Sequence, residues 1–299
     1  MLIVEIDSLY SFVEQISKIN DDYLIDNSPF AAEFLYRGHS KTTYELLPSI
    51  ARNRKFSCDV TILNGERNLI ELAKVKMPDI FKEDLKPLEL LALLQHYGIP
   101  TRLLDVTENA LVALYFACCS NFEDNGEVFA FLNNDDHVAN APIISAIAET
   151  YKLTRGATEY GLEHFYKAAL NQPYFTEQRH IFDETFNGTA WIDDCCKKIF
   201  FIYAPIRSLR QQIQKGRFIL FHNNIIDNYL GQGNKAFESK IEPIPKDDES
   251  IKGKFTIKKE NKKTILRDLK SCGISEDTLF CDSIDLVCKG IVDKAKKML

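Results

Sequence analysis

The sequence predicts a mixed protein of the α+β class, in which helices surround a β core within one compact domain. Two observations predict this class. Segments whose apolar residues recur at the helical spacing of about 3.6 residues are found along the chain, and short apolar runs of strand length lie between them. The hydrophobic fraction of 45% and the charged fraction of 27% are ordinary for a globular protein. We find no internal repeat and no convincing linker, so one domain with a helical periphery is the simplest arrangement.

Helices are expected wherever the apolar positions repeat at helical spacing. Asp7 or Ser8 is available to cap the first of them. In a later helix Pro87 suits the first turn, and Gly98 stands where a helix end favours glycine. The expected helices are residues 9–19, 68–77, 88–96, 110–119, most of 140–172, 206–213, 263–271 and 283–298.

Strands are expected where short apolar runs end at glycine or at polar residues. The first run stops at Arg37-Gly38, and in a later run alternation places Asp105 and Thr107 on the same face. The expected strands are residues 33–36, 101–107, 126–132, 198–203, 217–221 and 254–258.

The charge of the chain limits its partners. A net charge of −6 argues against broad affinity for nucleic acid, which needs a basic face. The lysine-rich run 252–263 includes Glu260 and alternates like a half-exposed strand, so we interpret it as a solvated edge. A nuclease is disfavoured by this charge and by the lack of clustered carboxylates that would bind a metal.

Neither a membrane segment nor a metal site is expected. No apolar run approaches the roughly 18 to 20 residues that span a bilayer, and residues 1–7 carry acids where a signal peptide needs apolar residues. These features predict a cytoplasmic protein. The eight cysteines form no C-x-x-C pair, and adjacent cysteines do not easily bind one tetrahedral zinc, so reduced structural thiols are expected.

Arg37 is the first candidate ligand-binding residue, because it ends an apolar run directly before Gly38. A buried guanidinium is costly unless it is paired, and its planar fork matches phosphate or carboxylate. Gly38 would let the backbone turn sharply or approach a ligand closely. One interpretation is that Arg37 binds an anionic ligand such as a pyrophosphate, and the other is an internal ion pair with Asp105.

The segment 95–107 is rich in polar side chains that either bind a ligand or need a partner. Asp105 lies between apolar neighbours, so we expect it to be half-buried and paired with Arg37 or Arg102. His96 is either a functional or a structural histidine. The candidates that this segment adds are Gln95, His96, Thr101, Arg102, Asp105 and Thr107.

A third group of candidates surrounds a run of glutamines. Arg210 and Gln214 precede Gly216 at the entry to an apolar run, so their side chains could reach a ligand. The alternative is a solvated helix end with Gly216 as its cap.

These segments together resemble the FRG domain family, which is named for a Phe/Tyr-Arg-Gly motif, here Tyr36-Arg37-Gly38. The resemblance continues through 95–105, through the apolar helix 110–117 and through the pattern Arg210, Gln214, Gly216 and Phe218. It covers about residues 30–285, and one departure is Val106, where tryptophan is expected. It implies a single FRG-type domain over 1–299, with residues 1–29 as a helical N-terminal extension.

The same strands are also similar to those of NAD-using ADP-ribosyltransferases. This resemblance implies an ADP-ribosyltransferase-like β core in which Arg37 holds the phosphates or ribose of NAD, with Asp105 and Thr107 near the nicotinamide pocket. The glutamate of those enzymes falls around residues 214–218, where this chain offers Gln214 instead. An amide cannot supply the negative charge that stabilises a cationic transition state, so the catalytic candidates are Asp105 and Gln214.

The leading hypothesis is therefore an NAD-dependent ADP-ribosyltransferase or NAD-hydrolysing effector of bacterial origin, in a toxin or phage-defence setting. NAD would be its substrate, and the acceptor would be a protein or nucleic acid that the sequence does not identify. The alternative is a non-catalytic module that senses a nucleotide or binds a partner protein.

Overall fold

The computed structural model describes residues 1–23, 32–52, 65–134, 137–138, 142–152, 198–205, 208–222, 224–230 and 234–280. The strands are β1 (Leu2–Ile6), β2 (Glu33–His39), β3 (Leu103–Thr107), β4 (Gly126–Asn133), β5 (His137–Val138), β6 (Phe200–Tyr203), β7 (Gly216–Leu220), β8 (Asn224–Leu230), β9 (Asn234–Lys240) and β10 (Ile251–Ile257). The α-helices are α1 (Leu9–Tyr23), α2 (Glu66–Lys76), α3 (Pro87–His96), α4 (Ala110–Cys118), α5 (Pro142–Ala148), α9 (Leu209–Ile213), α10 (Lys262–Ser271) and α11 (Glu276–Leu279). The expectation of a mixed protein with helices around a sheet is thus confirmed.

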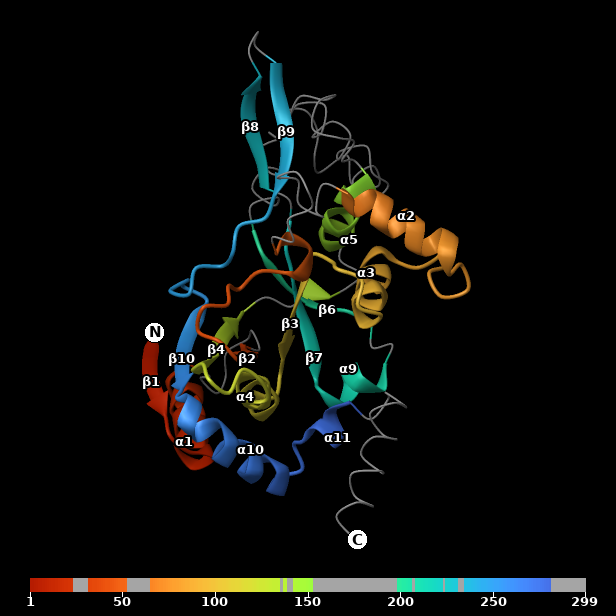
Figure 1. Ribbon diagram of the computed structural model, residues 1–299. Coiled ribbons are helices and arrows are strands. Elements are labelled where there is room, and N and C mark those ends of the chain that lie inside the picture. The colour runs from red at the N-terminus through yellow and green to blue at the C-terminus, as the bar shows by residue number, and fades with distance from the viewer. Residues whose placement is uncertain are drawn as a thin grey trace.

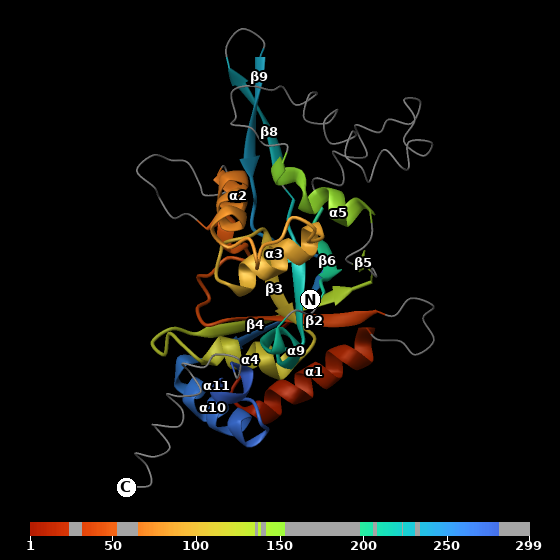
Figure 2. The same ribbon diagram turned by 90° about the vertical axis from the view of Figure 1, so that its right-hand side faces the viewer.

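One mixed sheet of eight strands forms the centre of the molecule, in the order β1-β10-β4-β2-β3-β7-β6-β5. It consists of two halves that meet at a single residue pair, Tyr36 of β2 opposite Thr107 of β3. The pairing between β2 and β4, by contrast, is continuous from Glu33–Asn133 to His39–Glu127. Figure 2 shows β2 and β4 running roughly horizontally, while β3 and the teal strand β7 beside it run roughly vertically. The sheet therefore opens between β2 and β3.

Separate groups of helices cover the two halves of the sheet (Figure 1). Helices α1, α4 and α10 pack on the half that contains β2, β4 and β10, through residues such as Phe12, Leu114 and Ile265. Helices α2, α3 and α5 pack against β3, β6 and β7, through residues such as Ile70 and Leu91. A third apolar cluster fills the remaining face of β2, β3 and β4 and includes the segment around Ser49–Ala51, which is a 3₁₀ helix. Burial of these faces supplies the main favourable free energy of folding.

Helix α4 approaches the sheet closely because glycine faces it from two strands. A Cβ atom on Gly38 would lie 1.9 Å from the carbonyl oxygen of Ala113, and one on Gly126 would lie 2.3 Å from that of Ala117. Only glycine permits this approach without a clash. Gly38 therefore lets β2 pack against α4, rather than producing the sharp turn that the sequence suggested.

Several expected elements differ in extent. Strand β2 continues to His39, so Arg37 lies inside the strand and not at its end. Strand β3 begins at Leu103, and α9 begins at Leu209. Within 140–172 the described part contains α5 and a 3₁₀ turn at Thr150–Lys152, while the helix expected at 283–298 lies outside the described residues.

The N-terminal segment is more than a helical extension. Strand β1 pairs in parallel with β10, from Leu2–Gly253 to Ile6–Ile257, so the first residues belong to the central sheet. This pairing also corrects the interpretation of the lysine-rich run, because β10 lies between β1 and β4 and is not an edge strand. Lys262, in the same run, is fully buried.

The hairpin of β8 and β9 has no counterpart among the expected elements, and it extends away from the central sheet in Figure 1. Among the described residues, no helix combines the length and the apolar character needed to cross a membrane.

Candidate functional site

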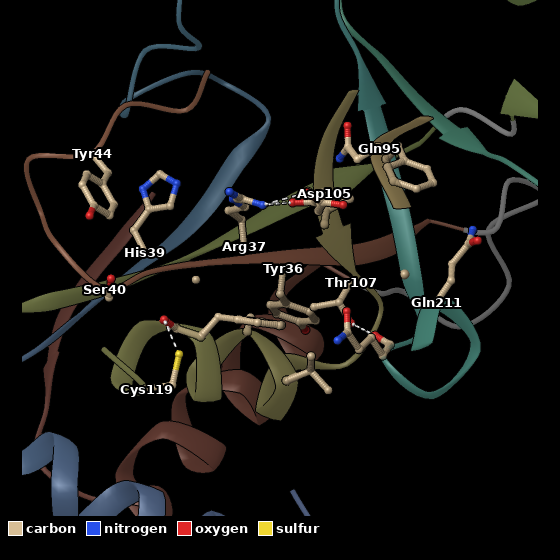
Figure 3. A pocket seen from close by; sticks show the side chains of 18 of the residues that line it. Tyr36, Arg37, His39, Ser40, Tyr44, Gln95, Asp105, Thr107, Cys119 and Gln211 are labelled. Carbon is tan, nitrogen blue, oxygen red and sulfur yellow. Dashed lines mark hydrogen bonds and ion pairs between the residues drawn. The ribbon is translucent and has the colours of Figure 1, made fainter. Parts of the chain in front are cut away.

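A cavity of about 780 Å³ lies where the two halves of the sheet separate (Figure 3). Its walls come from β2 and the loop that follows it, from the end of α3, from β3, from α4, and from α9 with the start of β7. Of the candidates from the sequence, those that line it are Tyr36, Arg37, Gly38, Gln95, His96, Asp105, Thr107, Arg210 and Gln214. Tertiary structure thus brings together most of a set that is scattered over the chain.

Arg37 occupies the junction of the two halves. Its Nη1 donates a hydrogen bond of 2.6 Å to the backbone carbonyl of Asp105 and lies 3.8 Å from Oδ2 of that residue. Its Nε is buried and has no hydrogen-bond partner within the described part of the chain. Burial lowers the pKa of Arg37 to about 10, with the Asp105 carboxylate opposing this shift and Arg52 adding to it. The guanidinium is therefore charged at neutral pH, and part of its donor capacity is unused.

Asp105 lies across from Arg37 on β3, and its side chain is 63% exposed. The expectation of a half-buried carboxylate is wrong, because this face of the strand borders the open cavity instead of an apolar layer. Thr107 shares the face but is buried. The Thr107 hydroxyl donates to the carbonyl of Gln214 over 2.6 Å and accepts from the backbone N–H of Asn109 over 3.0 Å. Thr107 therefore links β3 to the end of α9, while the Asp105 side chain is exposed at the cavity.

Tyr36 precedes Arg37 on β2, points to the opposite side of the strand and also lines the cavity (Figure 3). Its ring is buried and packs against Phe34, at 6.2 Å between ring centroids, in the cluster under α4. Burial raises the pKa of Tyr36 to about 12, so its hydroxyl stays protonated. The Tyr36 side chain therefore lines the cavity as a neutral group.

Two of the candidates from 95–107 do not line the cavity. Arg102 is fully buried on the other side, where its Nε donates to Oε1 of Glu66 over 2.8 Å and its other nitrogens donate to Thr150 and to backbone carbonyls of α5. The physical reason is that Arg102 precedes β3 and points under α2 and α5, where Glu66 neutralises it. Thr101 is also buried, and its hydroxyl bonds to Oε1 of Gln95. Both side chains, which were expected to bind a ligand, therefore bond within the fold and lie away from the cavity lining.

Gln95 and His96 reach the cavity from the last turn of α3. This helix ends in a Schellman motif, in which Gly98 has a φ of +79° and the N–H of Ile99 donates to the carbonyl of Leu94 over 3.0 Å. His96 is exposed, and its ring centroid lies 5.1 Å from that of Tyr97.

Arg210 and Gln214 belong to the opposite wall, on α9. The Nε2 of Gln214 donates to the carbonyl of Leu279 over 3.0 Å, and the Arg210 guanidinium lies 4.5 Å from the centroid of the Phe280 ring. Gln214 caps α9, and Lys215, not Gly216, adopts the left-handed conformation with a φ of 48°. The amide nitrogen of Gln214 is thus used to brace α11 against α9.

The structure adds cavity residues that the sequence reasoning missed, among them His39, Tyr44, Glu45 and Arg52. His39 is two residues beyond Arg37, on the same face of β2, and a longer estimate of that strand would have found it. The other three come from the loop and 3₁₀ segment after β2, for which periodicity offers no signal.

His39 is paired across the strands with Glu127 of β4, both side chains being buried. Its Nδ1 lies 3.5 Å from Oε1 of Glu127, which also bonds to Nζ of Lys246. Burial lowers the pKa of His39 to about 4, and the positive charges of Arg37 and Lys246 add to this effect while Glu127 opposes it. The imidazole is therefore neutral at pH 7.

The described residues contain no cluster of three or more His, Cys, Asp or Glu side chains that would hold a metal ion. Cys118, the last residue of α4, is buried, and Cys119 lines the cavity; burial raises the pKa of both thiols. Cys272 is exposed, and the other five cysteines lie outside the described residues.

Comparison with known proteins finds a family match for the part of the chain that contains β2, α3, β3 and α4. No curated protein and no solved structure matches the chain. Arg37, Gln95 and Asp105, which come together at the junction of the two half-sheets, all lie in the segment that matches a known family. Residues 32–126 match the FRG domain family.

Proposed function

We propose that the cavity binds NAD and that the protein is an ADP-ribosyltransferase or an NAD hydrolase. The observation that carries this proposal is the charged guanidinium of Arg37, which stands on the wall of a large cavity where the sheet opens. A guanidinium fork binds phosphate oxygens in a bidentate manner, and Nε of Arg37 has no partner among the described residues.

Other residues of the cavity fit a dinucleotide. A volume of about 780 Å³ lies within the range of pockets that enclose ligands of nucleotide size. Arg52 adds a second guanidinium to the lining, held by a hydrogen bond of 3.1 Å from its Nε to the carbonyl of Leu47. The Tyr44 ring, which is 44% exposed, offers an aromatic surface on which a base can stack.

Cleavage of NAD is favoured by a negative charge near the ribose. When the bond between ribose and nicotinamide breaks, positive charge develops on the ribose, and a carboxylate stabilises it. Asp105 is exposed to the cavity and is the candidate for this role. Gln214 is the weaker candidate, because its amide is neutral and its Nε2 is held by Leu279.

A second candidate function is a non-catalytic module that senses a nucleotide. It is favoured by the composition of the walls, since Asp105 and Glu45 are the carboxylates among the described residues that line the cavity. Neither lies on β7, where the resemblance to ADP-ribosyltransferases places a glutamate. In either case the proposed setting is a cytoplasmic effector of bacterial toxin or phage-defence type, with a protein or nucleic-acid acceptor if transfer occurs.

Incubation with labelled NAD and cell lysate tests the proposal. Release of nicotinamide together with label on a macromolecule would support transfer, and release alone would support hydrolysis. Saturable binding of NAD without release would support the sensing module. If NAD neither binds nor turns over, the proposal is wrong.

A further inference from the structure

His39 is a buried polar side chain on the cavity wall that the chemistry above does not use. The side chain is 3% exposed, and neither ring nitrogen has a hydrogen-bond partner within the described part of the chain, although Nδ1 lies 3.5 Å from Oε1 of Glu127. Figure 3 shows His39 beside Arg37, both rising from the same side of β2. An unsatisfied buried nitrogen is costly, so its persistence at a cavity wall points to a bound partner.

We propose that Nε2 of His39 accepts a hydrogen bond from a sugar hydroxyl of the ligand whose phosphate binds Arg37. This inference rests on the proposed function, and it specifies the ribose 5′-phosphate unit as the part of the nucleotide that the strand β2 recognises.

The surroundings of His39 determine which nitrogen accepts. Glu127 faces Nδ1 at 3.5 Å, and a carboxylate accepts hydrogen bonds but does not donate them. We therefore assign the single proton of the neutral ring to Nδ1, the nitrogen nearest to Glu127, which leaves the lone pair on Nε2. Lys246 neutralises Glu127 from the other side, so the carboxylate orients the ring without making it a cation.

The pKa of the His39 imidazole indicates whether it acts as a hydrogen-bond acceptor or as a general base. A pKa of about 4 is well below the value near neutrality that suits a general base at pH 7. A neutral imidazole of this kind binds a hydroxyl without removing its proton. His39 is accordingly a ligand-binding residue, and any proton transfer at the site belongs to another group.

The spacing along β2 specifies the ligand unit. Side chains at positions i and i+2 of a strand point the same way and are about 6 to 7 Å apart. Arg37 and His39 therefore present an anion-binding fork and a hydrogen-bond acceptor at this distance. A ribose 5′-phosphate carries its phosphate and its ring hydroxyls at a comparable separation. A free diphosphate lacks the hydroxyl, and a nucleoside lacks the phosphate.

The test uses the wild-type chain and calorimetric titration. The probes are the two halves of NAD, namely AMP and nicotinamide mononucleotide, and the 2′,3′-dideoxy form of each. For at least one half we expect the dideoxy form to bind about tenfold more weakly, the range for one hydrogen bond. If every dideoxy form binds as tightly as its parent, the inference is wrong although a nucleotide site remains. If NAD and both halves fail to bind, the proposed function fails as well.

Two variants connect the effect to the side chain. His39→Phe should bind the parent and dideoxy forms equally, and His39→Gln, which keeps an acceptor oxygen, should restore part of the difference. The control is His222→Phe, which removes another buried histidine that is not part of the cavity lining, and it should preserve the full ratio. A tenfold ratio that persists in His39→Phe would assign the hydroxyl to a different residue and overturn the inference.

Discussion

Nη1 of Arg37 donates a hydrogen bond of 2.6 Å to the backbone carbonyl of Asp105 and lies 3.8 Å from the Asp105 carboxylate. The contact with Asp105 that one interpretation of the sequence expected is therefore present. The guanidinium joins β2 to β3 where the sheet pairs through a single residue pair, and it also faces the cavity. The predictions below separate the structural contribution of this contact from its contribution to ligand binding.

We expect Arg37→Lys to fold and to lose about 1 to 3 kcal/mol of ligand-binding free energy, the range for charge-assisted hydrogen bonds. Lysine keeps the charge but loses the planar fork. Titration with NAD measures the change, and Arg267→Lys on the exposed face of α10 is the matched control. Unchanged affinity combined with a lowered melting temperature would mean that Arg37 is only a structural partner of β3.

Asp105→Asn distinguishes an enzyme from a sensor. Because the side chain is 63% exposed, we expect the free energy of unfolding to change by less than about 1 kcal/mol. In an enzyme, turnover of NAD should fall by about 100-fold or more while affinity changes little, as expected for a charge used mainly in the transition state. Asp124→Asn, which removes a carboxylate that is not part of the cavity lining, is the control.

If Asp105 acts only by holding Arg37, the two single variants and the double variant should show the same defect. Turnover that survives Asp105→Asn intact would exclude Asp105 from the mechanism and direct attention to Gln214.

Arg102→Met should destabilise the protein by about 3 to 5 kcal/mol, since it leaves the buried Glu66 without its partner. Burial raises the pKa of Glu66 even in the wild-type protein, and the positive charge of Arg102 opposes this rise. Urea unfolding measures the loss, and the double variant Arg102→Met with Glu66→Gln should recover part of it. The NAD affinity of the folded fraction should stay near that of the wild type. A loss of affinity comparable to that of Arg37→Lys would show that Arg102 contributes to ligand binding.

The buried imidazole of His39 makes the stability depend on pH. Its pKa is about 4 in the folded protein and near 6.5 when exposed, so between these values the unfolded chain binds the extra proton. Stability is therefore fully present above pH 6.5 and decreases as pH falls toward 4, by up to about 3 kcal/mol for this group. Urea unfolding of wild type and His39→Gln over this range should give curves that diverge at low pH. Parallel curves would show that His39 contributes nothing to the acid sensitivity.

Gly38→Ala tests the close contact between β2 and α4. A Cβ atom there would meet the Ala113 carbonyl oxygen at 1.9 Å, and we expect a loss of about 3 kcal/mol or more because the backbone must shift. At Gly65 a Cβ meets nothing within 4 Å, so Gly65→Ala should change stability by less than about 1 kcal/mol. Equal effects at the two sites would show that α4 can move away from the strand without loss.

Local patterns predicted the elements whose causes are local. Pro87 and Gly98 delimit α3 as the sequence suggested, because φ preference and the left-handed cap act within a few residues. Apolar runs likewise predicted β2, β4 and β7 to within a few residues. The strand β1 was not expected, because five residues with partial exposure become a strand only by pairing with β10 at the far end of the chain.

Some candidates that were chosen because their residue type is unusual in an apolar run do line the cavity. A candidate whose partner is distant in the sequence does not. Arg37 in an apolar run and Asp105 in the next strand both reached the cavity. Arg102 has the same chemistry as Arg37 but meets Glu66, which is 36 positions away in sequence. His39 was missed because β2 continues to His39, beyond the apolar run from which the strand was predicted.

The sequence by itself determined the class of the fold, most helices and strands, and a set of polar residues centred on Arg37 and residues 95–107. These follow from periodicity, glycine and proline preferences and the cost of burying charge, which are all properties of short segments. Only the tertiary structure decided where the sheet opens, which of two arginines faces the cavity, and that Glu127 lies against His39. Those outcomes depend on pairing between strands and on charges that are far apart along the chain, and no local pattern encodes which partners meet.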